Sequence, residues 1–149
     1  MLERCRPRID RGVAERPEWV RIRFTIQGPP RTKKNHNRLV RAGRRYRLIP
    51  SPAHERWYRD VCSQAWAIRE QLRRAGVELP IQGPVTVRAV FYRDRRVGDE
   101  CGYMQALGDW LERVQIIRND RQIHWGEVRL EKDAENPRIE VEIRTDAGE

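Results

Sequence analysis

Two hydrophobic periods alternate along this chain, and their order limits the folds that it can adopt. Alternating apolar and polar residues, the period of a half-buried strand, occur at residues 20–26, 85–91 and 139–143, with a further strand expected after a turn at residues 119–120. Residues 51–76 and 100–115 carry apolar side chains at helical spacing instead. This order predicts a small α+β domain in which a mixed sheet of about four strands packs against two main helices.

The length of 149 residues suits one domain with a modest core. Residues 1–17 contain two prolines, many charges and no hydrophobic period, so we expect them to form a flexible basic arm. The folded domain is expected at residues 18–145, followed by a tail at 146–149. Within that domain, the segment RLVRAGRRYRLIP, residues 38–50, has two short apolar pieces around a glycine and is expected to form a basic hairpin or loop.

Positive charge is concentrated in the first third of the chain. The formal net charge is +9, and residues 1–50 contain 15 Lys or Arg against 4 Asp or Glu. A basic segment on a nearly neutral body is typical of nucleic-acid-binding proteins, because Arg and Lys neutralise phosphates and release counterions. Since only three of the 31 basic residues are lysine, an arginine-rich genomic composition explains the charge equally well.

The cysteines and histidines argue against a structural zinc site. Cys5, Cys62 and Cys101 form no CxxC pair, and the histidines do not complete a zinc-binding spacing with them. No apolar run approaches the roughly 20 residues of a membrane span, and the N-terminus lacks the apolar core of a signal peptide. We therefore expect a cytoplasmic protein with reduced thiols and no membrane association.

Acidic residues surround the second predicted helix. Asp99 and Glu100 directly precede Cys101 at its start, Asp109 lies further along it, and Asp120 follows in the next turn. A helix packed back on the sheet could bring Asp99 and Asp120 to the same end of the fold, where they could share Mg²⁺ or Mn²⁺. Such ions support phosphodiester hydrolysis. Helix capping and turn formation explain the same acids without any catalysis.

The order of motifs resembles that of the RusA-type Holliday-junction resolvases, which are small phage and bacterial endonucleases. Four pieces carry the resemblance over most of residues 22–143: FTIQGPPRTKKNHNR, LIPSPAHERW, GDECGYMQALGDWL, and IIRNDRQI followed by NPRIEVEI. The resemblance implies a RusA-like fold and a homodimer that binds four-way DNA junctions in recombination and repair. It also implies paired, symmetric cuts that use Mg²⁺ or Mn²⁺ held by aspartates.

The family motif reads approximately D-x-D-N-x-x-K-A-x-x-D, followed by D-D-x-x-I. Laid on this chain, the motif implies that Asp99 and Asp120 are the catalytic, metal-binding aspartates, with Asp109 and Glu100 as weaker ligands. Four positions depart from it. The second metal-binding Asp is replaced by Cys101, the Asn by Gly102, the Lys by Gln105, and the first residue of the D-D pair by Asn119.

These departures affect residues that the resemblance implies would bind metal or phosphate. The thiol of Cys101 has an unperturbed pKa of about 8.5, so it is mostly protonated at neutral pH and too soft to favour Mg²⁺. Gln105 cannot offer a phosphate the positive charge of a lysine. Two hypotheses follow: a metal-dependent endodeoxyribonuclease of reduced activity, and a junction-binding protein without catalysis. A PD-(D/E)xK nuclease core is disfavoured, because no E-x-K or D-x-K tripeptide follows an acid on a suitable strand.

The resemblance also gives the basic segment a role. The family has a basic, Asn-containing loop where this chain has PPRTKKNHNR. We therefore expect contacts to DNA phosphates from Lys33, Lys34, Asn35 and Arg38, with weaker candidates at Arg44, Arg45 and Arg47.

Overall fold

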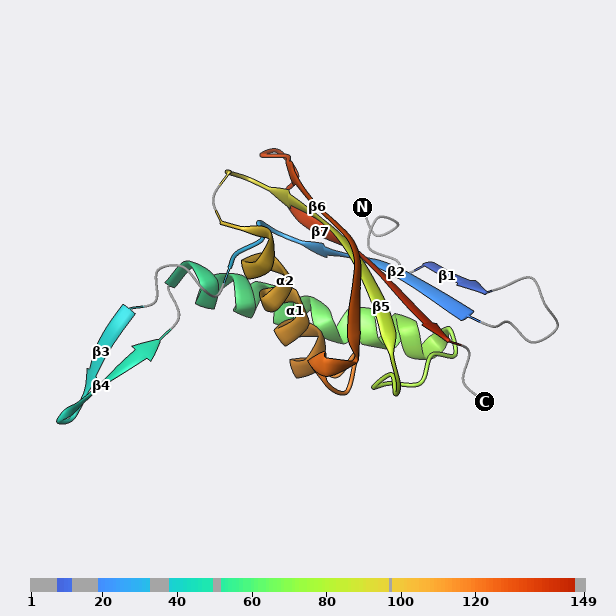
Figure 1. Cartoon of the computed structure of the whole chain (residues 1–149), viewed down its shortest axis with the longest axis horizontal. Coiled ribbons are helices and arrows are strands. Elements are labelled where there is room, and N and C mark those ends of the chain that lie inside the picture. Colours follow the sequence, from blue (N-terminus) through green and yellow to red (C-terminus); the bar gives the residue numbers. More distant parts are fainter. Residues whose placement is uncertain (1–7, 12–18, 33–37, 50–51, 97, 147–149) are drawn as a thin grey trace.

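A mixed five-stranded sheet, covered on one face by two helices, forms the body of the protein (Figure 1). The computed structural model describes residues 8–11, 19–32, 38–49, 52–96 and 98–146. The sheet has the order β1-β2-β7-β5-β6. Its strands are β1 (Arg8–Arg11), β2 (Trp19–Gln27), β5 (Val85–Arg93), β6 (Ile123–Lys132) and β7 (Arg138–Asp146). The helices are α1 (Pro52–Arg74) and α2 (Glu100–Arg113), so the predicted α+β class is confirmed.

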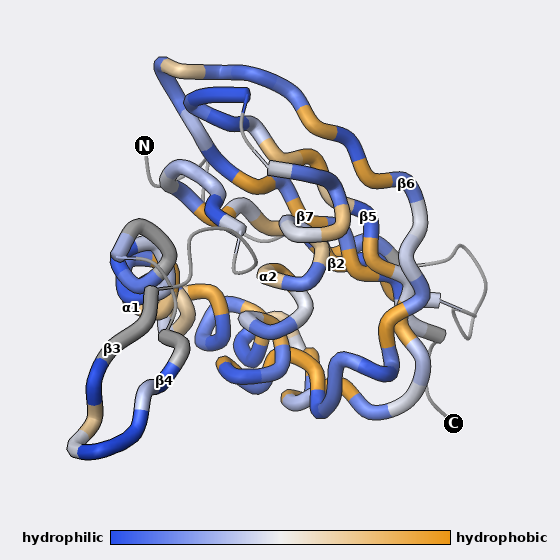
Figure 2. The backbone as a smooth tube through the Cα atoms, turned by 60° about the vertical axis from the view of Figure 1, so that its left-hand side comes forward, coloured by the Kyte–Doolittle hydropathy of each residue, from blue (hydrophilic) through white to orange (hydrophobic). Residues whose placement is uncertain are grey.

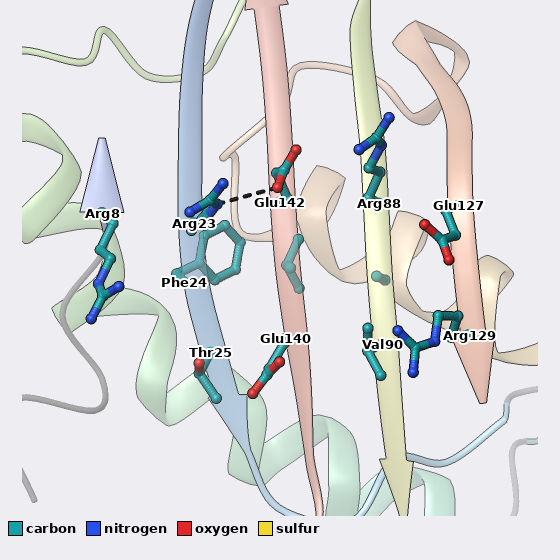
Figure 3. Close-up of a pocket in the computed structure, with 12 residues that line it drawn as sticks. Arg8, Arg23, Phe24, Thr25, Arg88, Val90, Glu127, Arg129, Glu140 and Glu142 are labelled. Carbon is teal, nitrogen blue, oxygen red and sulfur yellow. Dashed lines mark hydrogen bonds and ion pairs between the residues drawn. The ribbon is translucent and has the colours of Figure 1, made fainter. Parts of the chain in front are cut away.

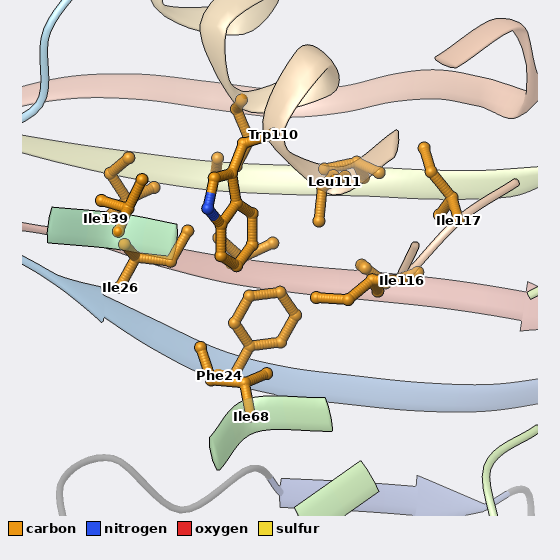
Figure 4. Packing of buried hydrophobic residues seen from close by; sticks show 14 of the residues in the cluster. Phe24, Ile26, Ile68, Trp110, Leu111, Ile116, Ile117 and Ile139 are labelled. Atoms are coloured by element: carbon orange, nitrogen blue, oxygen red, sulfur yellow. The ribbon is translucent and has the colours of Figure 1, made fainter. Parts of the chain in front are cut away.

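The core lies between the helices and the inner face of the sheet. Alternate residues of β2, β5 and β7 point inward, which is why these segments show the strand period. Trp110 of α2 is fully buried, and its ring lies 6.3 Å from that of Phe24, centroid to centroid (Figure 4). Each such buried side chain contributes roughly 1.5–3 kcal/mol of transfer free energy. The helical stripe of α2 therefore fixes its orientation on the sheet.

The first helix ends where the sequence predicts. Gly76 has a φ of +88°, and the amide N–H of Val77 donates to the carbonyl of Leu72 over 3.0 Å. Glycine adopts this left-handed conformation at no steric cost. Ser51, with which the predicted helical range begins, lies outside the described residues. Within the described part of the chain, neither helix is long and apolar enough to cross a membrane.

Strand β5 pairs antiparallel with β7 on one side and parallel with β6 on the other. A parallel neighbour requires a crossover connection, and α2 provides it by running back along the sheet. The start of β6 consequently lies beside the start of β5, with Ile123 paired to Val85. The turn before β6 is the single-turn 3-10 helix η2 (Asp120–Gln122).

The N-terminal segment differs from the expectation of a flexible arm. Residues 8–11 form β1, which pairs antiparallel with β2 and becomes the fifth strand of the sheet, with Ile9 opposite Ile22. Ile9 is partly buried against the core, and Asp10 lies 3.7 Å from the Arg23 guanidinium. A four-residue strand is too short to show a period in the sequence. Residues 1–7, 12–18 and 147–149 lie outside the described residues.

The basic segment forms the expected hairpin. Strands β3 (Arg38–Ala42) and β4 (Arg45–Ile49) pair antiparallel and make a two-stranded sheet of their own, separate from the main sheet. In Figures 1 and 2 the hairpin stands off the body beyond the start of α1, and its turn is strongly hydrophilic.

The outer face of the main sheet is charged rather than apolar (Figure 3). The Nε of Arg23 donates to Glu142 over 3.2 Å, and Arg21 lies 3.5 Å from the same carboxylate. On β6, Arg129 pairs with Glu131 over 2.8 Å. The Arg129–Glu131 pair is exposed, and such a pair contributes at most about 1 kcal/mol. The helices therefore cover the only face of these strands whose side chains build the described core.

One bidentate ion pair fastens the loop after β2 to the end of β5. The two terminal nitrogens of Arg31 donate to the two carboxylate oxygens of Asp94 over 2.8 and 3.0 Å. This hydrogen bonding lowers the pKa of the Asp94 carboxyl below its ordinary 3.8. The side chains are 20% and 31% exposed, so the pair is partly shielded from water.

We expect Asp94→Asn to lower the free energy of unfolding by about 1 kcal/mol at pH 7. Because the folded-state pKa of Asp94 is depressed, its stabilisation is full above the ordinary value of 3.8 and is lost as the pH falls through the folded pKa. Urea unfolding should therefore show the difference from wild type shrinking as the pH falls below about 4. Asp60→Asn, an exposed helical aspartate, is the control. A difference that is constant across pH would contradict the assignment.

Two glycines of α2 should respond to alanine with opposite signs. A Cβ at Gly102 would lie 2.8 Å from Asp99 Oδ1 and 3.0 Å from Thr32 Cγ2, so Gly102→Ala should disrupt the helix cap and cost about 1–2 kcal/mol. A Cβ at Gly108 would lie 3.5 Å from Ile123, an ordinary contact. Gly108→Ala should therefore stabilise the helix by roughly 0.5–1 kcal/mol in urea unfolding. Destabilisation by both variants would contradict this packing.

Candidate functional site

A groove of about 450 Å³ lies between α2 and the start of β6. One wall of the groove is formed by successive turns of α2, on the side of the helix that faces away from the buried Trp110. The lining residues are Cys101, Met104, Gln105, Gly108, Asp109, Asp120, Ile123 and Trp125.

Three carboxylates meet at the C-terminal end of α2. Oxygens of Asp109, Glu112 and Asp120 all lie within 4.8 Å of one another; Asp109 and Glu112 are half-buried and Asp120 is exposed. Like charges at this separation repel, and a divalent cation would offset that repulsion. Carboxylate oxygens are hard ligands of the kind that Mg²⁺ and Mn²⁺ prefer. The donor set therefore fits a hard divalent cation.

Hydrogen bonds around η2 fix the position of Asp120. The Asn119 side chain accepts from the Arg121 amide over 2.9 Å, and the Gln122 side chain accepts from the Asn119 amide over 2.6 Å. Gln122 also donates to the carbonyls of Ile81 and Gly83 over 2.8 and 2.7 Å. Asn119 thus serves as the cap of η2.

Asp99 lies at the other end of α2. It is the N-cap, and its Oδ1 accepts from the Gly102 amide over 2.8 Å. Gly108, beside which Asp120 packs, lies about 13 Å further along the helix axis. The expectation that Asp99 and Asp120 share one end of the fold is therefore wrong for a single chain. Parallel pairing of β5 and β6 is the reason, because the helix between them must traverse the sheet.

The other predicted residues fall into two groups. Cys101 is an exposed free thiol at the groove's N-terminal end, and Gln105 is exposed one turn further on, so both share the groove with Asp120. Glu100 is the exposed first residue of α2 and does not line the groove.

The expected DNA contacts are placed only in part. Lys33, Lys34 and Asn35 lie outside the described residues, and Arg38 begins β3. The weaker candidates Arg44, Arg45 and Arg47 are exposed on the hairpin.

Sequence reasoning did not single out Glu112 as a ligand. It lies three residues after Asp109, a spacing that puts both side chains on one helical face. This spacing in the sequence could have identified Glu112 as a second carboxylate beside Asp109.

Comparison with known proteins adds no assignment. No protein-family model matches the chain, and a search of the curated proteins likewise returns no match.

Proposed function

We propose that the protein is a structure-specific DNA endonuclease of the RusA type, which cuts four-way junctions by metal-dependent phosphodiester hydrolysis. One observation supports this most: Cys101, Gln105 and Asp120, assigned to the active site by the sequence resemblance alone, line the same groove. Cys101 and Gln105 come from one face of α2 and Asp120 from the turn before β6, while Asp99, which the resemblance also names, does not line this groove.

Asp109, Glu112 and Asp120 are the side chains that would hold Mg²⁺ or Mn²⁺. When bound, such an ion supplies Lewis-acid polarisation of a phosphodiester and lowers the pKa of an attacking water. The amide of Gln105 can donate a hydrogen bond to a phosphate oxygen, but it brings no charge. Cys101 leaves the N-terminal half of the groove without a carboxylate.

The second candidate is a junction-binding protein that does not cut. It is favoured by the state of the N-terminal half of the groove: Cys101 and Gln105 replace a ligand and a cation, and the carboxylate of Asp99 caps the helix. In either case we propose a cytoplasmic homodimer that binds branched DNA in recombination and repair.

We expect Asp120→Asn and Asp109→Asn each to weaken Mn²⁺ binding at least tenfold in calorimetric titration. Loss of a residue that only hydrogen-bonds to a metal ligand typically weakens metal binding about tenfold or more, and loss of the ligand itself should weaken it at least as much. Glu100→Gln, on the same helix but outside the groove, is the matched control and should bind Mn²⁺ like wild type.

Asp99→Asn should also leave Mn²⁺ binding unchanged, since this carboxylate caps the opposite end of α2. An equal loss in Asp99→Asn and Asp120→Asn would contradict a site confined to one chain. It would mean that Asp99 of a second copy completes the site.

Cys101→Asp should raise the rate at which a synthetic four-way junction is nicked in Mn²⁺ by tenfold or more, equivalent to about 1.4 kcal/mol, because it gives the N-terminal half of the groove a carboxylate that could hold an ion there. Residue 101 lies about 10 Å along the helix axis from Gly108, so this carboxylate would act separately from the cluster of Asp109, Glu112 and Asp120. Cys101→Ser, of similar size and uncharged, should cut like wild type. Wild type that cuts as fast as Cys101→Asp would show that the thiol does not impair the site. Junction binding without cutting by any variant would favour the second candidate.

A further inference from the structure

The hairpin of β3 and β4 contributes no strand to the main sheet among the described residues. Its two strands form a separate sheet, connected by a turn in which Gly43 has a φ of +66°. It extends away from the body in both views (Figures 1 and 2). A two-stranded hairpin is only marginally stable by itself in water. Packing in a core therefore does not explain which side chains this hairpin carries.

The charged side chains of the hairpin are all positive. Residues 38–49 contain five arginines and no acid. Arg41, Arg44, Arg45 and Arg47 are exposed, and no carboxylate among the described residues pairs with them. The one side-chain hydrogen bond that the described residues show here is local, from Arg41 Nε to the carbonyl of Gly43 over 3.0 Å. These guanidinium groups are thus available to an anionic partner.

An exposed aromatic ring lies among these arginines. Tyr46 is 65% exposed and, with Trp66 of α1, is one of two large hydrophobic side chains left exposed in the described structure. Strand pairing places Tyr46 opposite Arg41, so these two share a face of the hairpin. Arg45 and Arg47, its neighbours in β4, belong to the other face. The hairpin therefore carries cations on both faces and an aromatic ring on one.

This combination matches branched DNA better than continuous duplex. A two-stranded ribbon is narrow enough to enter a major groove, and cations on both faces can meet phosphates on either side. A tyrosine ring can stack on a base, but only where that base has a free face. Continuous duplex offers no such face, whereas stacking is interrupted where the strands of a junction exchange.

We propose that the β3–β4 hairpin recognises the branch point of DNA, with its arginines contacting backbone phosphates and Tyr46 stacking on a base at the strand exchange. This inference rests on the proposed junction substrate and names the element that distinguishes it from linear duplex. It does not depend on cleavage, because the hairpin contributes no residue to the groove at α2.

The test is binding of the full-length protein, in EDTA, to a synthetic four-way junction and to linear duplex of the same sequence. Tyr46→Ala and Tyr46→Leu should weaken junction binding by about 5- to 150-fold, the range for loss of one base–aromatic stack, and leave duplex binding unchanged. Tyr46→Phe should bind like wild type. The leucine variant keeps a bulky apolar side chain, so it separates stacking from any effect on hairpin stability.

Two further measurements separate the roles of the side chains. The double variant Arg45→Ala/Arg47→Ala should weaken binding to both DNAs and lower the slope of log affinity against log salt by about 2. A 2-aminopurine placed at the branch should change its fluorescence with wild type and Tyr46→Phe but not with Tyr46→Leu. Trp66→Ala, which removes the other exposed aromatic ring, is the matched control and should change neither affinity nor fluorescence.

The outcomes are distinguishable. Wild type that prefers the junction, with Tyr46→Ala and Tyr46→Leu retaining that preference, would overturn the hairpin proposal while leaving the junction substrate in place. Wild type without any preference for the junction over duplex would overturn the proposed function, and the hairpin proposal with it. Loss of the preference in both Tyr46 variants and its retention in Tyr46→Phe would support both.

Discussion

The parallel pairing of β5 with β6 determines the arrangement of the rest of the structure. It obliges α2 to run back along the sheet, and burial of Trp110 fixes which side of that helix meets the core. The polar side of α2 is thereby left facing the start of β6, and η2 packs beside Gly108 at ordinary contact distance. Groove, acidic cluster and the separation of Asp99 from Asp120 all follow from this one strand pairing.

Much of this architecture could be predicted from the hydrophobic periods in the sequence. The alternation in β2, β5 and β7 and the stripe on α2 mark the buried faces correctly, because a period records which side of an element meets the core. Strand direction leaves no comparable trace, since parallel and antiparallel strands share the same two-residue period. A different limit hid β1, because its four residues are too few to show a period and it joins the sheet by pairing with β2.

The candidate site divides in the same way. The spacing of Asp109 and Glu112 is a local property of a helix and could be predicted from the sequence. The neighbours of Asp120 could not, because Gln122 holds η2 in place through bonds to the carbonyls of Ile81 and Gly83, far away in the chain. Such contacts depend on tertiary structure. Likewise, an aspartate before a helix predicts a cap, and in this chain the side chain of Asp99 makes that capping hydrogen bond.

The two proposed activities, cleavage and junction binding, are assigned to parts of the chain with opposite charge. If the protein acts on DNA as proposed, the clustered carboxylates at the end of α2 would disfavour close approach of a phosphate to the groove, and a bound cation would reduce that repulsion. The hairpin carries no acid and needs no metal to attract the same backbone. On the proposed function, junction affinity and branch recognition would therefore not require the groove to be catalytic. A junction-binding role would then tolerate Cys101 and Gln105, whereas cleavage would depend on the carboxylates that remain.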